Sequence, residues 1–448
     1  MLFAFHFSVA CLANYAVLRR VSGAVRLAWL VYVTSYTITT VLGATIIGLR
    51  PAILDTIALS FGLDTRAIQS IDTFRYWLLL YAPLEIPAFV ILACHRLRFG
   101  AKKIIATTRS HVDIDAVSYL TVVAALSAYC FGLLYRHNYL GNIFLSIQNA
   151  RDYQSLIVLR TGAMEDLHTI FYGIVYMAFP TMSLVALWQA FAKRSSVWRV
   201  LFSITLCATV ILSLSIVLKG PLVLYIMTLC LGSVVLRLVR PVTLVAVGIA
   251  CVFAVTALQV LLTGSWSLAA TAFLLIFRMA HGVPYYVALF PGKVGFLGTN
   301  HGLGLLGIGG ANNDNLLVFD HMYPNINWVQ GATAAPSHLR AYSQGGYPAA
   351  LAVLFITACL IVLLGRWRER SGGPVAFAAY VQGLVAIYYL TQTSLRGILV
   401  ESYSVVFIAL PLAAVLALTQ IVRLAAAGVQ REVESCKDRT PMRPKLNS

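Results

Sequence analysis

The sequence predicts an all-α polytopic membrane protein, and three observations lead to that prediction. Of 448 residues, 60% are hydrophobic and 11% are charged, whereas soluble globular proteins carry about 25% charged residues. The hydrophobic residues gather in runs of the roughly 20 residues that a helix needs to cross the hydrocarbon layer. Basic residues gather in alternate loops between those runs. This composition excludes an ordinary soluble enzyme, a disordered chain and a disulfide-rich secreted scaffold.

Eleven apolar runs qualify as membrane spans, and we expect residues 1–448 to form a single integral membrane domain. The sixth and seventh runs are separated only by Lys219-Gly220-Pro221. One helix across both would be about 60 Å long at 1.5 Å per residue, twice the bilayer, so the chain must turn, and Gly-Pro supplies the break. The expected spans lie near 2–18, 27–48, 76–95, 116–135, 168–192, 197–217, 220–236, 242–263, 345–365, 375–391 and 401–422.

Lysine and arginine in the short loops predict the orientation, because cytoplasmic loops are enriched in them. The basic clusters that alternate with the spans lie at 19–26, 96–109, 193–199, 237–240, 366–370 and beyond 423. That side holds 22 of the 33 lysines and arginines. The net charge of +17 therefore reports orientation, and no nucleic-acid partner is expected. We expect the N-terminus outside and the C-terminus, with the tail 424–448, in the cytoplasm.

Two expected outer segments are long enough to build a site. The segment 264–344 is large enough for a small cap outside the membrane, and 136–167 is a second periplasmic segment. Loops longer than about 15 residues are usually functional or disordered, and the aromatic content of 264–344 argues against disorder. None of the eight cysteines lies in an outer loop, which excludes disulfides and a cysteine-based metal site there.

The outer face is expected to carry nine arginines but only two lysines. Arginine keeps its charge when desolvated and presents a planar fork to phosphate oxygens. Lys219, Arg278, Arg340 and Arg396 lie at expected membrane edges, where they would suit the phosphates of a lipid-linked substrate. Snorkelling to phospholipid headgroups is the alternative for each of them. We favour a site because four such residues accompany a long, aromatic-rich loop.

His338 lies just before an expected span, and it shares a helix face with Tyr342 if 337–344 is helical. A neutral imidazole can take a proton from a sugar hydroxyl. The alternative is a loop histidine bonded to the backbone. The sequence has no HExxH pattern and no paired histidine spacing, so we expect no metal. The Gly302–Gly307 segment matches a dinucleotide pattern but lies in an outer loop, so we expect no nucleotide cofactor.

Two further features leave alternatives open. Glu85 lies inside a span between Pro83 and Pro87; it suits a proton or ion site, or it satisfies backbone groups that the prolines free. The segment with Arg151 and Arg160 mixes Arg, Asn, Asp and Tyr. Such residues suit sugar recognition, and they equally suit an amphipathic helix at the interface.

Several of these features recur together in one family. They are Arg151 to Arg160 before a middle span, Ser213 followed by Lys219 between two spans, Arg278 with Pro284-Tyr285-Tyr286, Tyr342 with Gly345-Gly346-Tyr347, and the turn Ser394-Leu395-Arg396-Gly397. With these features the chain resembles the Wzy-type oligosaccharide repeat-unit polymerases of bacterial O-antigen and exopolysaccharide assembly. The similar features run across most of the chain.

The resemblance implies a GT-C-like membrane fold in the bacterial inner membrane, with the active site facing the periplasm. It implies a metal-independent glycosyltransferase without a cofactor, which transfers a glycan from undecaprenyl diphosphate to the next repeat unit. It makes His338 the candidate base, and Arg278, Arg340 and Arg396 the candidate diphosphate clamps. We expect substrate contacts from Lys219, Arg151, Arg160, Tyr285, Tyr286 and Tyr342. Membrane lipids, a chain-length regulator and a flippase are the expected partners.

Three other functions remain open. An O-antigen-type ligase shares the topology, although the chain lacks the clear His-Asn pair that is common before the ligase span. A lipid-linked oligosaccharide flippase or ion-coupled transporter would use Glu85, yet polar residues concentrate at the outer edge rather than at mid-membrane. A non-catalytic scaffold of a polysaccharide synthesis complex is the third alternative.

Overall fold

The structure is a computed structural model, and every regular element among the residues that it describes is helical. This confirms the all-α prediction. The structure describes residues 1–21, 23–53, 55, 63–68, 71–96, 113–142, 144–145, 162, 166–215, 219–240, 277, 280–298, 314–324, 333–399, 401 and 403–438. The helices are α1 (Leu2–Arg20), α2 (Gly23–Tyr36), η1 (Thr37–Val41), α3 (Leu42–Leu49), η2 (Thr65–Ile68), α5 (Thr73–Arg96), α6 (Ala116–Arg136), η4 (Tyr139–Gly141), α9 (Thr169–Gly173), η5 (Ile174–Ala178), α10 (Phe179–Lys193), α11 (Ser196–Ser215), α12 (Lys219–Val235), α15 (Gly282–Leu289), α17 (Asp314–Met322), α18 (Ser337–Arg370), α19 (Gly373–Tyr389), α20 (Leu395–Leu399) and α21 (Val406–Asp438).

Within the described part of the chain, eight helical stretches are long and apolar enough to cross a membrane. They are Leu2–Arg20, Gly23–Leu49, Thr73–Arg96, Ala116–Arg136, Thr169–Lys193, Ser196–Ser215, Ser337–Arg370 and Val406–Gln430. Two shorter apolar helices, Pro221–Val235 and Gly373–Tyr389, coincide with two more of the eleven expected spans. The expected span at 242–263 lies outside the described residues. The chain is therefore a multi-pass membrane protein by the length and composition of its helices.

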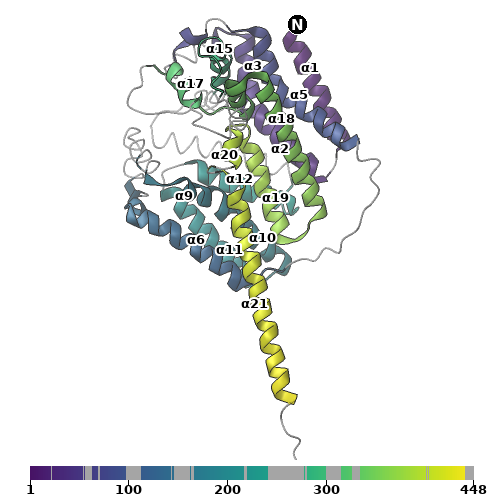
Figure 1. Cartoon of the computed structure of the whole chain (residues 1–448), viewed down its shortest axis with the longest axis vertical. Helices are drawn as coiled ribbons and strands as arrows, with labels where there is room; N and C mark the ends of the chain where they lie inside the picture. Colours follow the sequence, from purple (N-terminus) through teal and green to yellow (C-terminus); the bar gives the residue numbers. More distant parts are fainter. Residues whose placement is uncertain are drawn as a thin grey trace, which may run out of the picture.

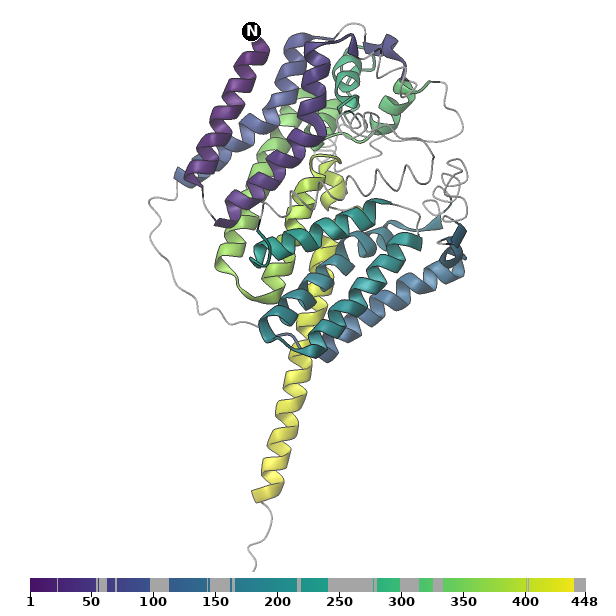
Figure 2. The same ribbon diagram turned by 180° about the vertical axis from the view of Figure 1, so that it is seen from behind.

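The helices form two groups joined by α19 (Figure 1). In the first group α1 packs on α5, and α18 packs on α5 and α2. In the second group α10 packs on α11, and α6 packs on α11 and α21. Helix α19 contacts α2, α10, α12 and α18, so it connects the groups. Figure 2 shows the same division from behind, with α21 projecting beyond the bundle at the end opposite the N-terminus.

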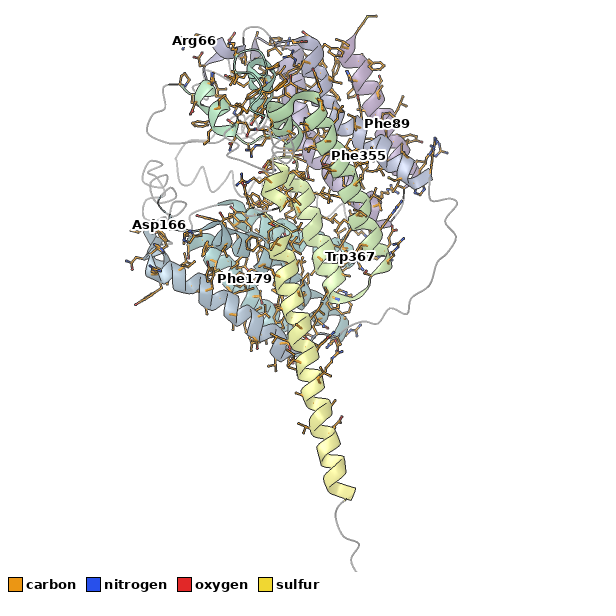
Figure 3. The ribbon with its side chains drawn as sticks, in the orientation of Figure 1. Arg66, Phe89, Asp166, Phe179, Phe355 and Trp367 are labelled. Atoms are coloured by element: carbon orange, nitrogen blue, oxygen red, sulfur yellow. The ribbon has the colours of Figure 1, made fainter. Side chains whose placement is uncertain are left out.

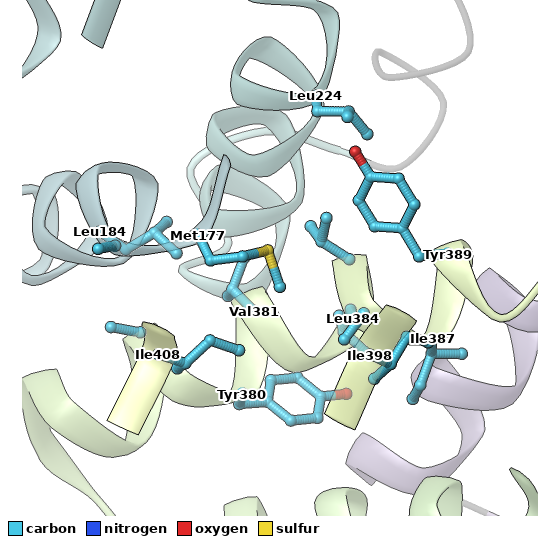
Figure 4. Close-up of a cluster of buried hydrophobic side chains, with 14 of the residues drawn as sticks. Met177, Leu184, Leu224, Tyr380, Val381, Leu384, Ile387, Tyr389, Ile398 and Ile408 are labelled. Carbon is cyan, nitrogen blue, oxygen red and sulfur yellow. The ribbon is translucent and has the colours of Figure 1, made fainter. Parts of the chain in front are cut away.

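The interior and the periphery are both apolar. Figure 4 shows part of the larger core cluster, where Met177, Val381 and Ile408 meet from η5, α19 and α21. On the outside, Phe89, Phe355 and Trp367 are exposed in the bundle, as Figure 3 shows. Large exposed apolar patches mark interaction or membrane surfaces. Exposed aromatic rings on helices of this length fit a bundle that is surrounded by lipid.

Two breaks separate helical segments near glycine or proline. Helix α11 ends at Ser215 and α12 begins at Lys219, so the sixth and seventh expected spans are separate helices, with Gly220 and Pro221 in the first turn of α12. Helix α18 is interrupted at Gly345 and Gly346. Gly346 has φ 68° and ψ −154°, a conformation that is essentially restricted to glycine. The short segment 337–344 is helical, which meets the condition for His338 and Tyr342 to lie on one helix, and it leads at an angle into the long part of α18.

The short helices α15, α17 and η2 pack together against α5 and α18. Helix α15 contacts η2, α17, α5 and α18. The backbone amide of Asp64 donates to the carbonyl of Met322 (2.8 Å), and the hydroxyl of Tyr285 donates to the carbonyl of Asp64 (2.7 Å). These bonds join segments from two expected outer loops into one structure. We call α15, α17 and η2 the cap.

Candidate functional site

The short first part of α18 places Arg340 against the cap. Its Nη2 donates to Oδ1 of Asp314 at 2.8 Å, and its Nε donates to Oδ2 at 3.1 Å. The hydroxyl of Tyr286 donates to the same Oδ2 at 2.9 Å. The Asp314 side chain is fully buried and that of Arg340 is 12% exposed. Asp314 is the first residue of α17, where the helix dipole favours a negative charge.

Burial, and second the negative charge of Asp314, hold the pKa of Tyr286 well above its usual value of 10. The hydroxyl therefore stays protonated and keeps donating to the carboxylate. An ion pair in a low-dielectric site is strong only when its remaining lone pairs are also satisfied. Tyr286 supplies one such bond, so the three side chains fix the cap to α18 as one unit.

A second arginine–carboxylate pair lies at the turn between α19 and α21. Nε of Arg396 is 2.9 Å from Oε1 of Glu401, and the two side chains are 34% and 45% exposed. The charge of Glu401 also acts on Arg340. The backbone amide of Ser337 donates to the carbonyl of Leu390 at 3.0 Å. This bond ties the start of α18 to the end of α19, so both pairs lie at the same end of these helices.

We call Arg340, Asp314, Arg396 and Glu401 the arginine–carboxylate cluster. It brings together two of the four edge residues that the sequence predicted, and it adds two carboxylates that the sequence analysis did not assign to the site. In Figures 1 and 2 the helix that carries Arg396, α20, lies between the two groups of helices. The cluster therefore contains one buried arginine and one more exposed arginine, at the place where the two groups of helices meet.

Aromatic side chains adjoin the cluster. The rings of Tyr389 and Tyr403 stack with their centroids 3.6 Å apart. The ring of Tyr176, from η5, meets Tyr403 edge-on at 5.2 Å. The charge of Glu401 acts on Tyr403, which places this aromatic group beside the exposed arginine–carboxylate pair. The sequence analysis did not identify these three tyrosines, because they are far apart in the chain.

His338 is buried against α5 rather than exposed on a loop. Its Nε2 lies 2.9 Å from the carbonyl oxygen of Leu79, so Nε2 carries the proton and donates it. Pro83 has no N–H, which leaves the Leu79 carbonyl without its helical partner four residues later. The imidazole replaces that partner. The ring is 1% exposed and meets Tyr36 edge-on at 5.8 Å. Of the two roles considered for His338, the structure shows the histidine that bonds the backbone. Proton transfer at His338 would require α5 or α18 to move.

The predicted substrate-contacting tyrosines are buried in the described structure. Tyr285 and Tyr286 bond Asp64 and Asp314 as given above, and the hydroxyl of Tyr342 donates to the carbonyl of Phe290 at 3.2 Å. All three tyrosine side chains are almost inaccessible. The bonds of Tyr285 and Tyr286 hold the parts of the cap together, and the bond of Tyr342 joins α18 to the end of α15. His338 and Tyr342 do lie on one helical segment, but one contacts α5 and the other the end of α15.

The remaining predicted site residues cannot be placed beside the cluster. Arg278, Arg151 and Arg160 lie outside the described residues. Lys219 is the first residue of α12, and its side chain is also outside the described part. In the part of the chain that the structure describes, no group of three or more His, Cys, Asp or Glu residues is arranged to hold a metal ion.

Glu85 pairs with His6 across the α1–α5 contact. Nδ1 of His6 is 3.0 Å from Oε1 of Glu85, and the two residues are 6% and 9% exposed. The sequence left open whether Glu85 satisfies backbone groups that the prolines free. The carbonyl of Leu79, which Pro83 frees, is bonded by His338, and the observed partner of Glu85 is His6. The sequence analysis gave no role to His6. A histidine near the start of the first span has no local signal that connects it with an acid 79 residues later.

No family model matches the chain, and the comparisons with curated proteins and with solved structures give no match.

Proposed function

We propose that this chain is a membrane glycosyltransferase that polymerises oligosaccharide repeat units carried on undecaprenyl diphosphate into O-antigen or exopolysaccharide. The Wzy-type resemblance of the sequence motivates the substrate class. The single structural observation that supports the proposal is the arginine–carboxylate cluster, in which Glu401 pairs with Arg396 and its charge also acts on Arg340. In the proposed orientation this cluster is at the periplasmic face of the bacterial inner membrane.

The chemistry of the cluster suits a diphosphate leaving group. The bond between the anomeric carbon and the lipid diphosphate breaks, and its electron pair stays on the diphosphate oxygen. Positive charge that is already positioned in a low-dielectric site stabilises that developing charge. The partly exposed Arg396 is the residue that would meet the phosphates. The buried Arg340 is already paired with Asp314, and it holds the cap beside the site. No metal ion or cofactor is needed for this step.

Glu401 is the group in the cluster best placed to accept a proton. It is the more exposed of the two carboxylates, whereas Asp314 is bonded by Arg340 and Tyr286. As the acceptor sugar hydroxyl attacks the anomeric carbon, its oxygen forms the new glycosidic bond and its proton passes to Glu401. We therefore assign the base role to Glu401 ahead of His338, because the His338 imidazole is buried and its Nε2–H is held by Leu79.

Gene deletion and complementation test the proposal. Cells that lack the chain should carry polysaccharide reduced to single repeat units, and the wild-type gene should restore long chains. Glu401→Gln should fail to restore them, because the amide cannot accept the proton. Glu369→Gln is the matched control. Glu369 lies at the end of α18 opposite Arg340, so this variant should restore full chains. Full-length polymer in Glu401→Gln cells at wild-type protein level would overturn the base assignment.

The His6–Glu85 pair favours a second candidate function, an ion-coupled flippase or transporter of lipid-linked oligosaccharide. Ionisable groups buried within a membrane span commonly mark ion or proton pathways. The same deletion separates the two functions. Loss of a flippase strands lipid-linked units on the inner face of the membrane, whereas loss of a polymerase leaves single units at the outer face. Glu85→Gln should abolish transport if the pair carries protons and should leave polymer formation intact if it does not.

A further inference from the structure

A series of tyrosines extends from the arginine–carboxylate cluster into the second group of helices. Tyr389 and Tyr403 stack beside Glu401, and Tyr176 meets Tyr403 as described. The ring of Tyr172 follows at 6.5 Å from Tyr176. The hydroxyl of Tyr139 contributes to the electrostatic environment of Tyr172, so Tyr139 continues the series toward the end of α6. The five residues come from α9, η5, α19, η4 and the turn before α21.

The hydroxyls of this series differ from those of the other buried tyrosines. Other buried tyrosine hydroxyls have a well-formed hydrogen bond. The partner is a backbone carbonyl for Tyr36, Tyr76, Tyr119 and Tyr380, and a side chain for Tyr286 and Tyr225. In the series, the hydroxyls of Tyr176 and Tyr389 approach that of Tyr403. The Tyr389 hydroxyl is buried and has no well-formed hydrogen bond to any described residue. Burying an unsatisfied polar group costs about 1–3 kcal/mol, and a ligand hydroxyl would remove that cost.

The backbone around Tyr176 is built to hold its ring in place. Residues Ile174–Ala178 form a π-helical turn, a feature that occurs frequently at functional sites. Nε2 of Gln382 donates to the Tyr176 carbonyl at 3.2 Å. Gly173 lets Phe407 pack against this turn, because a Cβ there would lie 2.1 Å from the Phe407 ring. Helices α19 and α21 therefore fix the position of Tyr176 relative to Tyr389 and Tyr403.

Both ends of the series are polar. At one end Glu401 and Arg396 form the exposed pair. At the other end the hydroxyl of Tyr139 donates to the carboxylate of Asp166, and the His137 ring stacks on Tyr139 at 5.9 Å. Figure 3 shows Asp166 at the end of α6. Nδ1 of His137 lies 3.8 Å from Oδ2 of Asp166, and both side chains are partly exposed. An oligosaccharide presents both C–H faces and hydroxyl groups, which aromatic rings and hydrogen-bonding groups can contact.

We infer that Tyr139, Tyr172, Tyr176, Tyr389 and Tyr403 form a glycan-binding track, which leads the oligosaccharide from the His137–Asp166 end to the arginine–carboxylate cluster. Tyrosine presents an apolar face to the C–H groups of a sugar ring and a hydroxyl to the sugar hydroxyls. The inference deepens the proposed function and rests on it for the identity of the glycan. It assigns the sugar chain to the tyrosines and the lipid diphosphate to the arginines.

Ligand binding tests the track without requiring turnover. The probe is the water-soluble oligosaccharide that mild acid releases from the lipid-linked repeat units of the cells. Saturation-transfer NMR measures its binding to the full chain purified in detergent. Tyr403→Ala and Tyr176→Leu should weaken binding by roughly 3- to 10-fold, the scale of one aromatic contact. Tyr380→Phe is the matched control, because Tyr380 lies on α19 but donates to Ala24, and it should bind like wild type.

The thermal unfolding midpoint of each variant shows whether it is folded. If Tyr403→Ala does not fold, Tyr389→Phe provides the second test. It keeps the ring, removes the unsatisfied hydroxyl, and should weaken oligosaccharide binding without lowering stability. Wild-type affinity in folded Tyr403→Ala or Tyr389→Phe, or no saturation transfer to the wild-type chain, would overturn the track. The free oligosaccharide carries no diphosphate lipid, and its binding requires no turnover at the arginine–carboxylate cluster. A failure of the proposed catalytic site would therefore appear in polymer formation and leave this measurement unchanged.

Discussion

Arg340 on α18 donates to both carboxylate oxygens of Asp314 on α17, at 2.8 Å from Nη2 and 3.1 Å from Nε. The pair joins the cap to the helix that begins the long span, and its charges are almost completely removed from solvent. A buried pair of this kind gives little net stability by itself, but breaking it leaves an uncompensated charge. The cluster is therefore expected to tolerate paired changes better than single ones.

Arg340→Ala and Asp314→Ala should each lower the free energy of unfolding by about 3–5 kcal/mol, because each leaves its partner buried and unpaired. The double variant Arg340→Met/Asp314→Leu should lose clearly less than the sum of the two. Denaturant unfolding in detergent measures all three. Simple additivity of the single losses would contradict a direct coupling between the two side chains.

His338 is expected to stabilise the fold by donating a hydrogen bond to the carbonyl of Leu79. His338→Ala should cost about 1–3 kcal/mol, the penalty for an unsatisfied buried polar group. In a Pro83→Ala background residue 83 regains an N–H, which restores the helical partner of Leu79, so the same substitution should cost less. The double-mutant cycle is measured by thermal unfolding.

Activity in that cycle separates the two roles of His338. A positioning residue should regain part of its lost polymer formation in the Pro83→Ala background. Complete loss of polymer in both backgrounds, at equal protein levels and equal stability, would instead support His338 as the base.

The break in α18 should depend on Gly346. A side chain at φ 68° and ψ −154° is strained, and its Cβ would lie 3.0 Å from the Phe296 ring. Gly346→Ala should therefore destabilise the protein by about 1–3 kcal/mol, and truncating Phe296 should relieve little of this loss, because the strain is in the backbone. Pro348→Ala, two residues later in the same helix, is the control. Unchanged unfolding of Gly346→Ala would show that the break is not required.

Hydropathy predicted most of the apolar helices, because this signal is local. Ten of the expected spans coincide with apolar helices of the described structure, and the sixth and seventh are separate helices, with Gly220-Pro221 at the start of the second. The side-chain partners of the site could not be predicted in the same way. Asp314 reaches Arg340 and Leu79 reaches His338 through folding of distant segments, the latter across 259 residues.

The two arginines illustrate this limit. The sequence placed Arg340 and Arg396 at membrane edges, but it gave no reason to prefer one over the other. The structure shows that Arg340 is buried with Asp314, while Arg396 shares the more exposed pair with Glu401. A local signal for that pair existed in the five-residue separation of Arg396 and Glu401 around a tight turn. Burial, which decides which arginine a substrate can reach, depends on tertiary packing.

The most direct measurement of the central claim is the length distribution of the polysaccharide in deletion cells that express Arg396→Ala at the wild-type protein level. Removing one group that stabilises a developing negative charge typically slows the chemical step by roughly 10²- to 10³-fold. We expect single repeat units in place of long chains. Arg370→Ala cells should make normal chains, because Arg370 lies at the end of α18 opposite Arg340. A normal ladder of chain lengths in Arg396→Ala cells would contradict the proposed site.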